Sequence, residues 1–136
     1  MKQSIHVLLT GAILMAAAPL AYAQEGSFPA VCQSGMTMTP PMQSGDEMHM
    51  TKDHQKAAME GMMKMDRDMM QGMMKDDADV AFVCGMIAHH QGAIDMANVE
   101  LQHGDDAWAK EMAKKVIDAQ TKEIAEMTTW LKDNAK

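Results

Sequence analysis

No proline follows Pro41 in this chain, and that absence constrains the fold more than any other feature of the sequence. Proline breaks a helix interior, so everything after Pro41 is free to form long helices. Apolar residues in this region recur at spacings of three, four and seven, the pattern of an amphipathic helix. This pattern predicts three helices, over roughly 52–74, 77–103 and 106–134, and aspartates stand where the second and third need N-caps.

No strand pattern is present, and the connections between the three helices are short. Short connections make neighbouring helices antiparallel. The sequence therefore predicts an all-α fold, an antiparallel up-down-up helical bundle. The second helix is apolar on nearly every side and is expected to be central. One of its sides carries small residues, where a neighbour can approach closely: Ala81, Gly85, Ala88 and Gly92.

The third predicted helix is apolar on one face, and Gln120 interrupts its apolar stripe. One interpretation is a polar residue tolerated near the edge of the bundle. The other is a hydrogen-bond partner for a buried side chain on the second helix, because buried polar groups need partners. Both interpretations stay open at this point.

The chain divides into three parts. Residues 1–23 have the layout of a secretory signal peptide, with Lys2, an apolar run and an Ala-Tyr-Ala cleavage site. An uncleaved anchor is the alternative, but no second apolar run follows, so no membrane span is expected after processing. Residues 24–51 are expected to form a flexible, Met-rich N-terminal segment, and residues 52–136 the helical bundle domain. Export predicts a periplasmic, oxidising location.

Several classes of function are excluded. The net charge is −7, which argues against binding to nucleic acid or to an anionic membrane, because both need clustered basic residues. No phosphate-binding loop, structural zinc spacing or nucleophile–base arrangement is present. A di-iron carboxylate bundle needs two Glu-x-x-His motifs, and only residues 100–103 fit that motif. An enzyme is therefore not expected.

Methionine replaces leucine in the mature chain. Of 19 methionines, all but Met1 and Met15 follow the signal, whereas leucine there occurs only at Leu101 and Leu131. The two side chains are similar in volume and helix propensity, and leucine specifies a core better because methionine is flexible. Packing alone does not explain this choice, so the sulfur or the flexibility must be used.

Eight methionines lie on the first predicted helix. Seven fall on one stripe about 140° wide, with Met65 just outside it: Met59, Met62, Met63, Met69, Met70, Met73 and Met74. Asp66 sits within the stripe, and a carboxylate on a dry face is costly, so this face is either partly wet or serves cations. A packed core, a groove for partner helices and sacrificial oxidation are the alternatives.

Thioether sulfur is a soft, neutral donor that favours Cu(I), and imidazole also accepts Cu(II). Residues three or four apart on a helix can share one metal ion. In the N-terminal segment, Met48, His49 and Met50 offer two sulfurs and a nitrogen. The chemistry predicts copper, with Cu(I) favoured, and does not distinguish it from silver, which is also soft.

A second group of donors lies on the second predicted helix. Met86, His89, His90 and Met96 fall within about 120° of one another. A lone histidine usually has a structural role or faces solvent, and His54 and His103, near helix ends, are assigned that role. Adjacent histidines flanked by methionines are better explained as ligands.

Cys32 and Cys84 admit two interpretations. As a disulfide in an oxidising compartment, they would pin the N-terminal segment to the central helix. As thiolates, they would be ligands of Cu(I). The disulfide is favoured, because Cys84 lies on the core face of its helix, away from Met86.

Two stretches of the sequence carry a resemblance to a known family: residues 79–97 (DVAFVCGMIAHHQGAIDMA), and residues 119–127 (AQTKEIAEM) with Trp130 and Leu131. They resemble the CopM-like family of exported, ferritin-like helical copper-binding proteins, long catalogued as a domain of unknown function. The resemblance implies a four-helix fold, a role in copper tolerance, and ligands at Met86, His89, His90 and Met96, with Met127 as a further candidate. Only three helices are predicted, so the N-terminal segment or a second chain would fill the fourth position.

The expected function is an exported protein that sequesters or chaperones copper through Met and His ligands. A copper efflux pump or a multicopper oxidase is the expected recipient. The alternative is a Met-rich helical module that binds partner helices without metal.

Overall fold

The computed structural model describes residues 28–35 and 51–135, and within these ranges the chain contains helices and no strand. A short 3₁₀ helix, η1 (Ala30–Cys32), precedes α1 (Asp53–Met73), α2 (Ala78–His103) and α3 (Ala107–Asn134). The all-α prediction is confirmed, and each predicted helix end agrees to within one residue. The signal peptide expected over 1–23, and Met48, His49 and Met50, lie outside the described residues.

Aspartate side chains begin two of the helices, as predicted. The Asp77 carboxylate accepts hydrogen bonds from the backbone N–H groups of Asp79 and Val80, and α2 starts at the next residue. Asp106 accepts from the backbone N–H of Ala109 at 2.8 Å and caps α3. These caps satisfy donors that a helix start leaves unpaired, which fixes where each helix begins.

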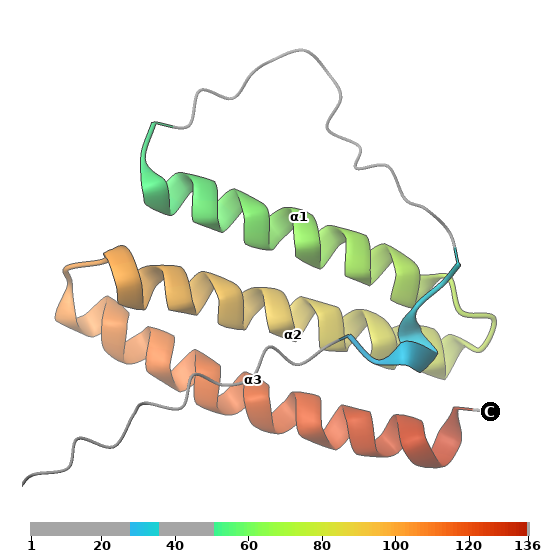
Figure 1. Ribbon diagram of the computed structural model, residues 1–136. Coiled ribbons are helices and arrows are strands. Elements are labelled where there is room, and N and C mark those ends of the chain that lie inside the picture. The colour runs from blue at the N-terminus through green and yellow to red at the C-terminus, as the bar shows by residue number, and fades with distance from the viewer. Residues whose placement is uncertain (1–27, 36–50, 136) are drawn as a thin grey trace, which may run out of the picture.

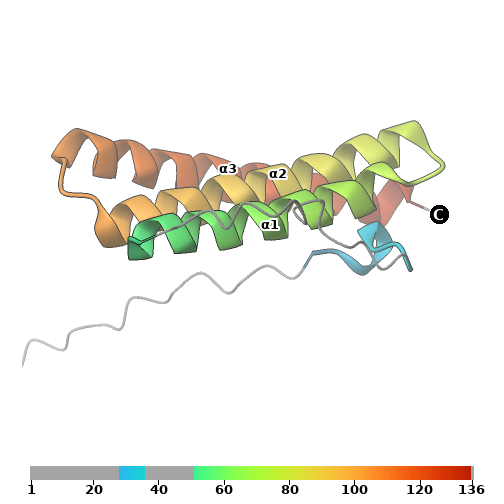
Figure 2. The same cartoon turned by 90° about the horizontal axis from the view of Figure 1, so that it is seen from above.

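The helix α2 lies between the other two helices (Figure 1), and it packs along both α1 and α3. The chain runs along α1, returns along α2 and runs forward again along α3, so adjacent helices point in opposite directions. Viewed from above, residues 28–35 lie beside the end of the molecule where α1 ends and α2 begins (Figure 2). Because α1 and α3 hardly touch each other, α2 alone holds the three helices together.

The packed core lies at that same end of the molecule. It joins Cys32, Val80, Cys84, Ile87 and Leu131, and Phe28 and Met127 pack against it. Residues 28–35 therefore belong to the folded domain, although the sequence pattern favoured a flexible segment over all of 24–51. Burial of Phe28 and a covalent bond to α2 account for this difference.

The structure joins Cys32 and Cys84 in a disulfide, with the Cα atoms 5.4 Å apart and both side chains fully buried. The favoured of the two cysteine interpretations is confirmed. Two hydrogen bonds hold the same segment on α1 and the loop after it: the Gln71 side chain accepts from the Ser34 N–H, and Lys75 Nζ donates to the Gln33 carbonyl.

Glycines bring α1 and α2 close together. A Cβ atom added at Gly72 would lie 2.8 Å from the carbonyl carbon of Cys84, closer than real Cβ atoms approach. On α2, Met73 lies over Gly85 and Met65 lies over Gly92. The prediction that small residues on α2 admit a close neighbour is confirmed.

Among the described residues, none of the helices has the length and hydropathy needed to cross a bilayer.

Candidate metal centre

The methionine stripe of α1 faces mainly solvent. We call these seven residues the methionine surface, which consists of Met59, Met62, Met63, Met69, Met70, Met73 and Met74. Five of them are exposed, with Met73 at 61% and Met74 at 55%, while Met59 and Met69 are partly buried. The side of α1 that packs on α2 includes Gly61, Gly72 and Met65, the methionine outside the stripe, and of the stripe itself Met73 reaches over Gly85. A packed core therefore does not account for the stripe.

The exposed position of Asp66 fits this arrangement. A carboxylate is costly on a dry face, but on a wet one it keeps its hydration. The acidic residue therefore adds negative charge beside the sulfurs without disturbing the packing of α1 on α2.

Three methionines from two helices meet at one hollow. Met69 and Met73 come from α1 and Met86 comes from α2, and they line a hollow of about 280 Å³ together with Ala81, Phe82 and Gly85. Met69 and Met73 are four residues apart and so lie on one face of α1. Gly85 has no side chain, which lets Met73 reach across α2. We call this hollow the methionine cavity, and nearly all of its lining is apolar.

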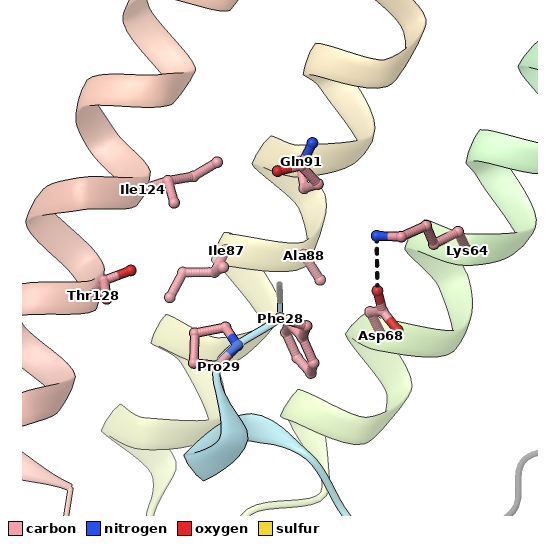
Figure 3. Close-up of a pocket in the computed structure, with 9 residues that line it drawn as sticks. All are labelled: Phe28, Pro29, Lys64, Asp68, Ile87, Ala88, Gln91, Ile124 and Thr128. Carbon is pink, nitrogen blue, oxygen red and sulfur yellow. Dashed lines mark hydrogen bonds and ion pairs between the residues drawn. The ribbon is translucent and has the colours of Figure 1, made fainter. Parts of the chain in front are cut away.

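A different hollow lies on the face that carries residues 28–35 (Figure 3). Phe28, Pro29, Ile87 and Ile124 line it, and Lys64 is paired with Asp68 at 3.3 Å on its α1 side. None of its lining residues is a methionine, a histidine or a cysteine. It therefore lacks donors for a soft metal ion.

The two adjacent histidines of α2 have different surroundings. His90 is buried, 8% exposed, whereas His89 is exposed. His90 Nε2 lies 2.6 Å from Glu123 Oε2 on α3. An ionised carboxylate only accepts, so a hydrogen resides on Nε2, and in the neutral ring the other nitrogen carries a lone pair. That nitrogen, Nδ1, is buried and has no hydrogen-bond partner among residues 28–35 and 51–135.

An imidazole held by a carboxylate through one nitrogen, with the other nitrogen free, has the form of a metal ligand with an orienting partner. The sequence did not single out Glu123. One of its two interpretations of Gln120 made that residue the partner of a buried side chain on α2, and the structure gives that role to Glu123, three residues further along α3. Residue spacing along α3 does not show which of its turns lies opposite His90, so it could not distinguish Gln120 from Glu123.

The remaining predicted ligands are dispersed. Met96 is 50% exposed on α2, and Met127 packs against the core cluster. Within the described residues, His, Cys, Asp and Glu form no group of three or more that could hold a metal ion. Cys32 and Cys84 are joined to each other and offer no thiolate. The predicted donors that do share one hollow are Met69, Met73 and Met86 of the methionine cavity.

Replacing Glu123 by Gln is expected to lower the free energy of unfolding by about 0.5–1 kcal/mol, because Glu123 is half exposed, exposed ion pairs contribute about 0.2–1 kcal/mol, and the amide oxygen still accepts from Nε2. Chemical denaturation measures this change. Nitrogen NMR of the histidine rings should show the hydrogen of His90 on Nε2 in the unmodified protein. A ring hydrogen on Nδ1 would contradict the assignment.

Comparison with known proteins adds one match. The model of a family described as "Domain of unknown function (DUF305)" matches residues 32–131. The matched range begins at the disulfide cysteine Cys32 and ends at the core residue Leu131, so it covers α1, α2 and all but the last three residues of α3. Among proteins of curated function, none matches the chain.

Proposed function

Since the chain belongs to the DUF305 family, whose description assigns no activity, we propose from its own residues that it binds copper. In this proposal the protein holds Cu(I) through methionine sulfurs. Its task is to sequester the ion or to pass it on, and it catalyses no reaction.

The single observation that carries the proposal is the convergence of Met69, Met73 and Met86 on the methionine cavity. A methionine surface in solvent gains little from hydrophobic burial, so the sulfurs need another explanation. Thioethers are neutral and do not titrate, so they bind Cu(I) without releasing protons. An apolar lining with sulfur donors favours Cu(I) or Ag(I) over hard cations, which prefer oxygen.

The negative charge of the protein supports the same role. The net charge is −7, and an acidic surface raises the local concentration of cations. The exposed methionines Met62, Met63 and Met70 continue from the cavity along α1 and supply further soft donors. In the proposal, several weak sites beside one stronger site allow the protein to buffer more than one ion.

The histidines of α2 would supply nitrogen donors for copper in this proposal. Met86 precedes His89 by three residues and His90 by four, so the three side chains are neighbours on one helix. His90 Nδ1 would be the donor atom, and Glu123 would hold the ring in place. Imidazole also accepts Cu(II), so this part of the surface would bind either oxidation state.

The cellular location, the recipient of the ion and the complete bundle are proposed from the sequence. The signal peptide over 1–23 would export the protein to the periplasm, where it would contribute to copper tolerance as a CopM-like protein. A copper efflux pump or a multicopper oxidase would receive the ion. The three helices would be part of a ferritin-like four-helix bundle, with the N-terminal segment or a second chain in the fourth position. The exposure of Phe82 and Met96 on α2 supports such a covering element.

Replacing Met69, Met73 and Met86 together by Leu tests the proposal. Leucine nearly conserves volume and costs less than about 1.5 kcal/mol per site, so the helices should remain. Competition with a Cu(I) chelator should show at least one fewer tightly bound ion. Met112→Leu is the matched control, because this exposed methionine lies on α3, outside the cavity. Equal Cu(I) binding by the triple variant and the unmodified protein would refute the proposal.

A Met-rich module that binds partner helices is the second candidate. It is favoured by Phe82, which is 67% exposed beside the methionine cavity. The same triple variant separates the two functions, since leucine keeps the apolar area but removes the sulfur. Retained helix binding with unchanged metal content would favour the module.

A further inference from the structure

Two histidines that are far apart in the sequence come together at the end of the molecule opposite the disulfide. His54 lies in the first turn of α1, and His103 is the last residue of α2. Their ring centres are 6.4 Å apart, with the ring planes tilted by 53°. Both side chains are exposed. In Figure 1, this is the end where α1 begins and α2 finishes.

The packing of α1 on α2 sets this spacing. The two helices run antiparallel, so the start of one lies beside the end of the other. Near this end, Gly61 of α1 packs against Asp95 of α2, where an added Cβ would lie 3.4 Å from the Asp95 Cβ. The histidines are therefore held on neighbouring backbones, and only side-chain rotation is needed to change the orientation of the two rings.

We propose that His54 and His103 form a second metal site, which binds Cu(II) between the ends of α1 and α2. Imidazole nitrogens lie about 2.0–2.1 Å from a bound metal ion, so two rings that share one ion have centres roughly 4.5 Å apart when their nitrogens are cis and roughly 6.5 Å apart when they are trans. The observed separation of 6.4 Å fits two histidines on opposite sides of one ion. Imidazole suits Cu(II), and Cu(II) binds nitrogen sites more tightly than the other divalent metals of its row.

The position on α2 favours a cation. His103 stands in the last turn of α2, where the exposed carbonyl ends of the helix give a partial negative charge. Asp53, next to His54, adds a carboxylate at the same end, where it lies 3.9 Å from Lys56 Nζ and offsets the partial positive charge at the start of α1. Neither ligand of this site is a methionine, so the site would favour Cu(II). The methionine cavity, with its soft sulfur donors, would favour Cu(I). The proposal does not rest on copper binding at that cavity.

The test compares His54→Ala, His103→Ala and the double variant with the unmodified protein, using copper(II) sulfate as the probe. Electron paramagnetic resonance should show nitrogen ligation that each single substitution reduces. The affinity for this ion should fall at least about tenfold in either variant, because removing even an outer-shell partner costs about 10–100-fold. Gln102→Ala, which removes an exposed side chain next to His103 that is not a predicted ligand, is the matched control and should change neither readout.

A bridged site has a signature that two separate histidines lack. Either single substitution should abolish the site, and the double variant should lose no more than each single one. Added copper(II) should also raise the melting temperature of the unmodified protein by more than that of either variant, since an ion shared by His54 and His103 ties α1 to α2. Additive losses in the double variant, or unchanged affinity in either single one, would overturn the proposal. Cu(I) competition on the same variants reports the methionine cavity separately, so failure of one site is distinguishable from failure of the other.

Discussion

Replacing Cys32 and Cys84 by Ala is expected to lower the free energy of unfolding by about 4 kcal/mol, the chain-entropy value for a loop of this length. The two cysteines are 52 residues apart, so the disulfide removes much freedom from the unfolded chain. Both side chains are fully buried at the centre of the core cluster, so the variant also leaves packing defects there. Urea unfolding measures the change.

The alanine variant should lose stability locally, in residues 28–35, as well as globally. Without the disulfide, residues 28–35 keep only Phe28 packing and the hydrogen bonds of Ser34 and Lys75. Their backbone amides should exchange hydrogen faster, while those in the middle of α3 change with global stability alone. Reduction of the unmodified protein is the control and should reproduce the shift. An unchanged urea midpoint in the alanine variant would mean that the disulfide does not support the fold.

Replacing Gly72 by Ala is expected to lower the free energy of unfolding by about 1–3 kcal/mol, the usual cost of overpacking. The new Cβ would meet the backbone of Cys84 and Gly85 within 2.9 Å, and backbone atoms cannot turn aside as a side chain can. The helices α1 and α2 would have to separate at this point. Met73 lies next to Gly72, so Cu(I) binding at the methionine cavity should weaken together with stability.

Gly61→Ala provides the matched control on the same helix. An added Cβ there meets only the Asp95 Cβ, at 3.4 Å, an ordinary contact. Alanine favours a helix over glycine by about 0.5–1 kcal/mol, so this variant should be slightly more stable than the unmodified protein. Thermal or urea unfolding of the two variants should therefore give shifts of opposite sign. Shifts of the same sign and size would show that the Gly72 contact is not tight.

Much of the local structure was predictable because it depends on residues near one another in the chain. The aspartates at 77 and 106 cap helices that the apolar spacing had already located. The small residues on α2 signalled a close neighbour, and Gly85 and Gly92 do receive side chains from α1. The disulfide was favoured by the position of Cys84 on the core face of its helix.

The candidate site was predicted only in part. The sequence grouped Met86 with His89, His90 and Met96, because they share a sector of one helix. The structure instead places Met86 with Met69 and Met73 across the interface, and it turns His90 inward to Glu123. Residue spacing along one helix cannot identify such partners, since they come from a second helix whose rotation is not encoded locally.

By itself, the sequence determined that three helices form, two of them capped by aspartate, that α2 is central, and that sulfur replaces hydrocarbon along one stripe of α1. Those properties follow from short-range spacing and residue chemistry. Only the tertiary structure decided that this stripe faces solvent, that three methionines close one hollow, and that His54 lies beside His103. A stripe shows that a helix has a distinct face, but the crossing and rotation of packed helices decide what that face meets.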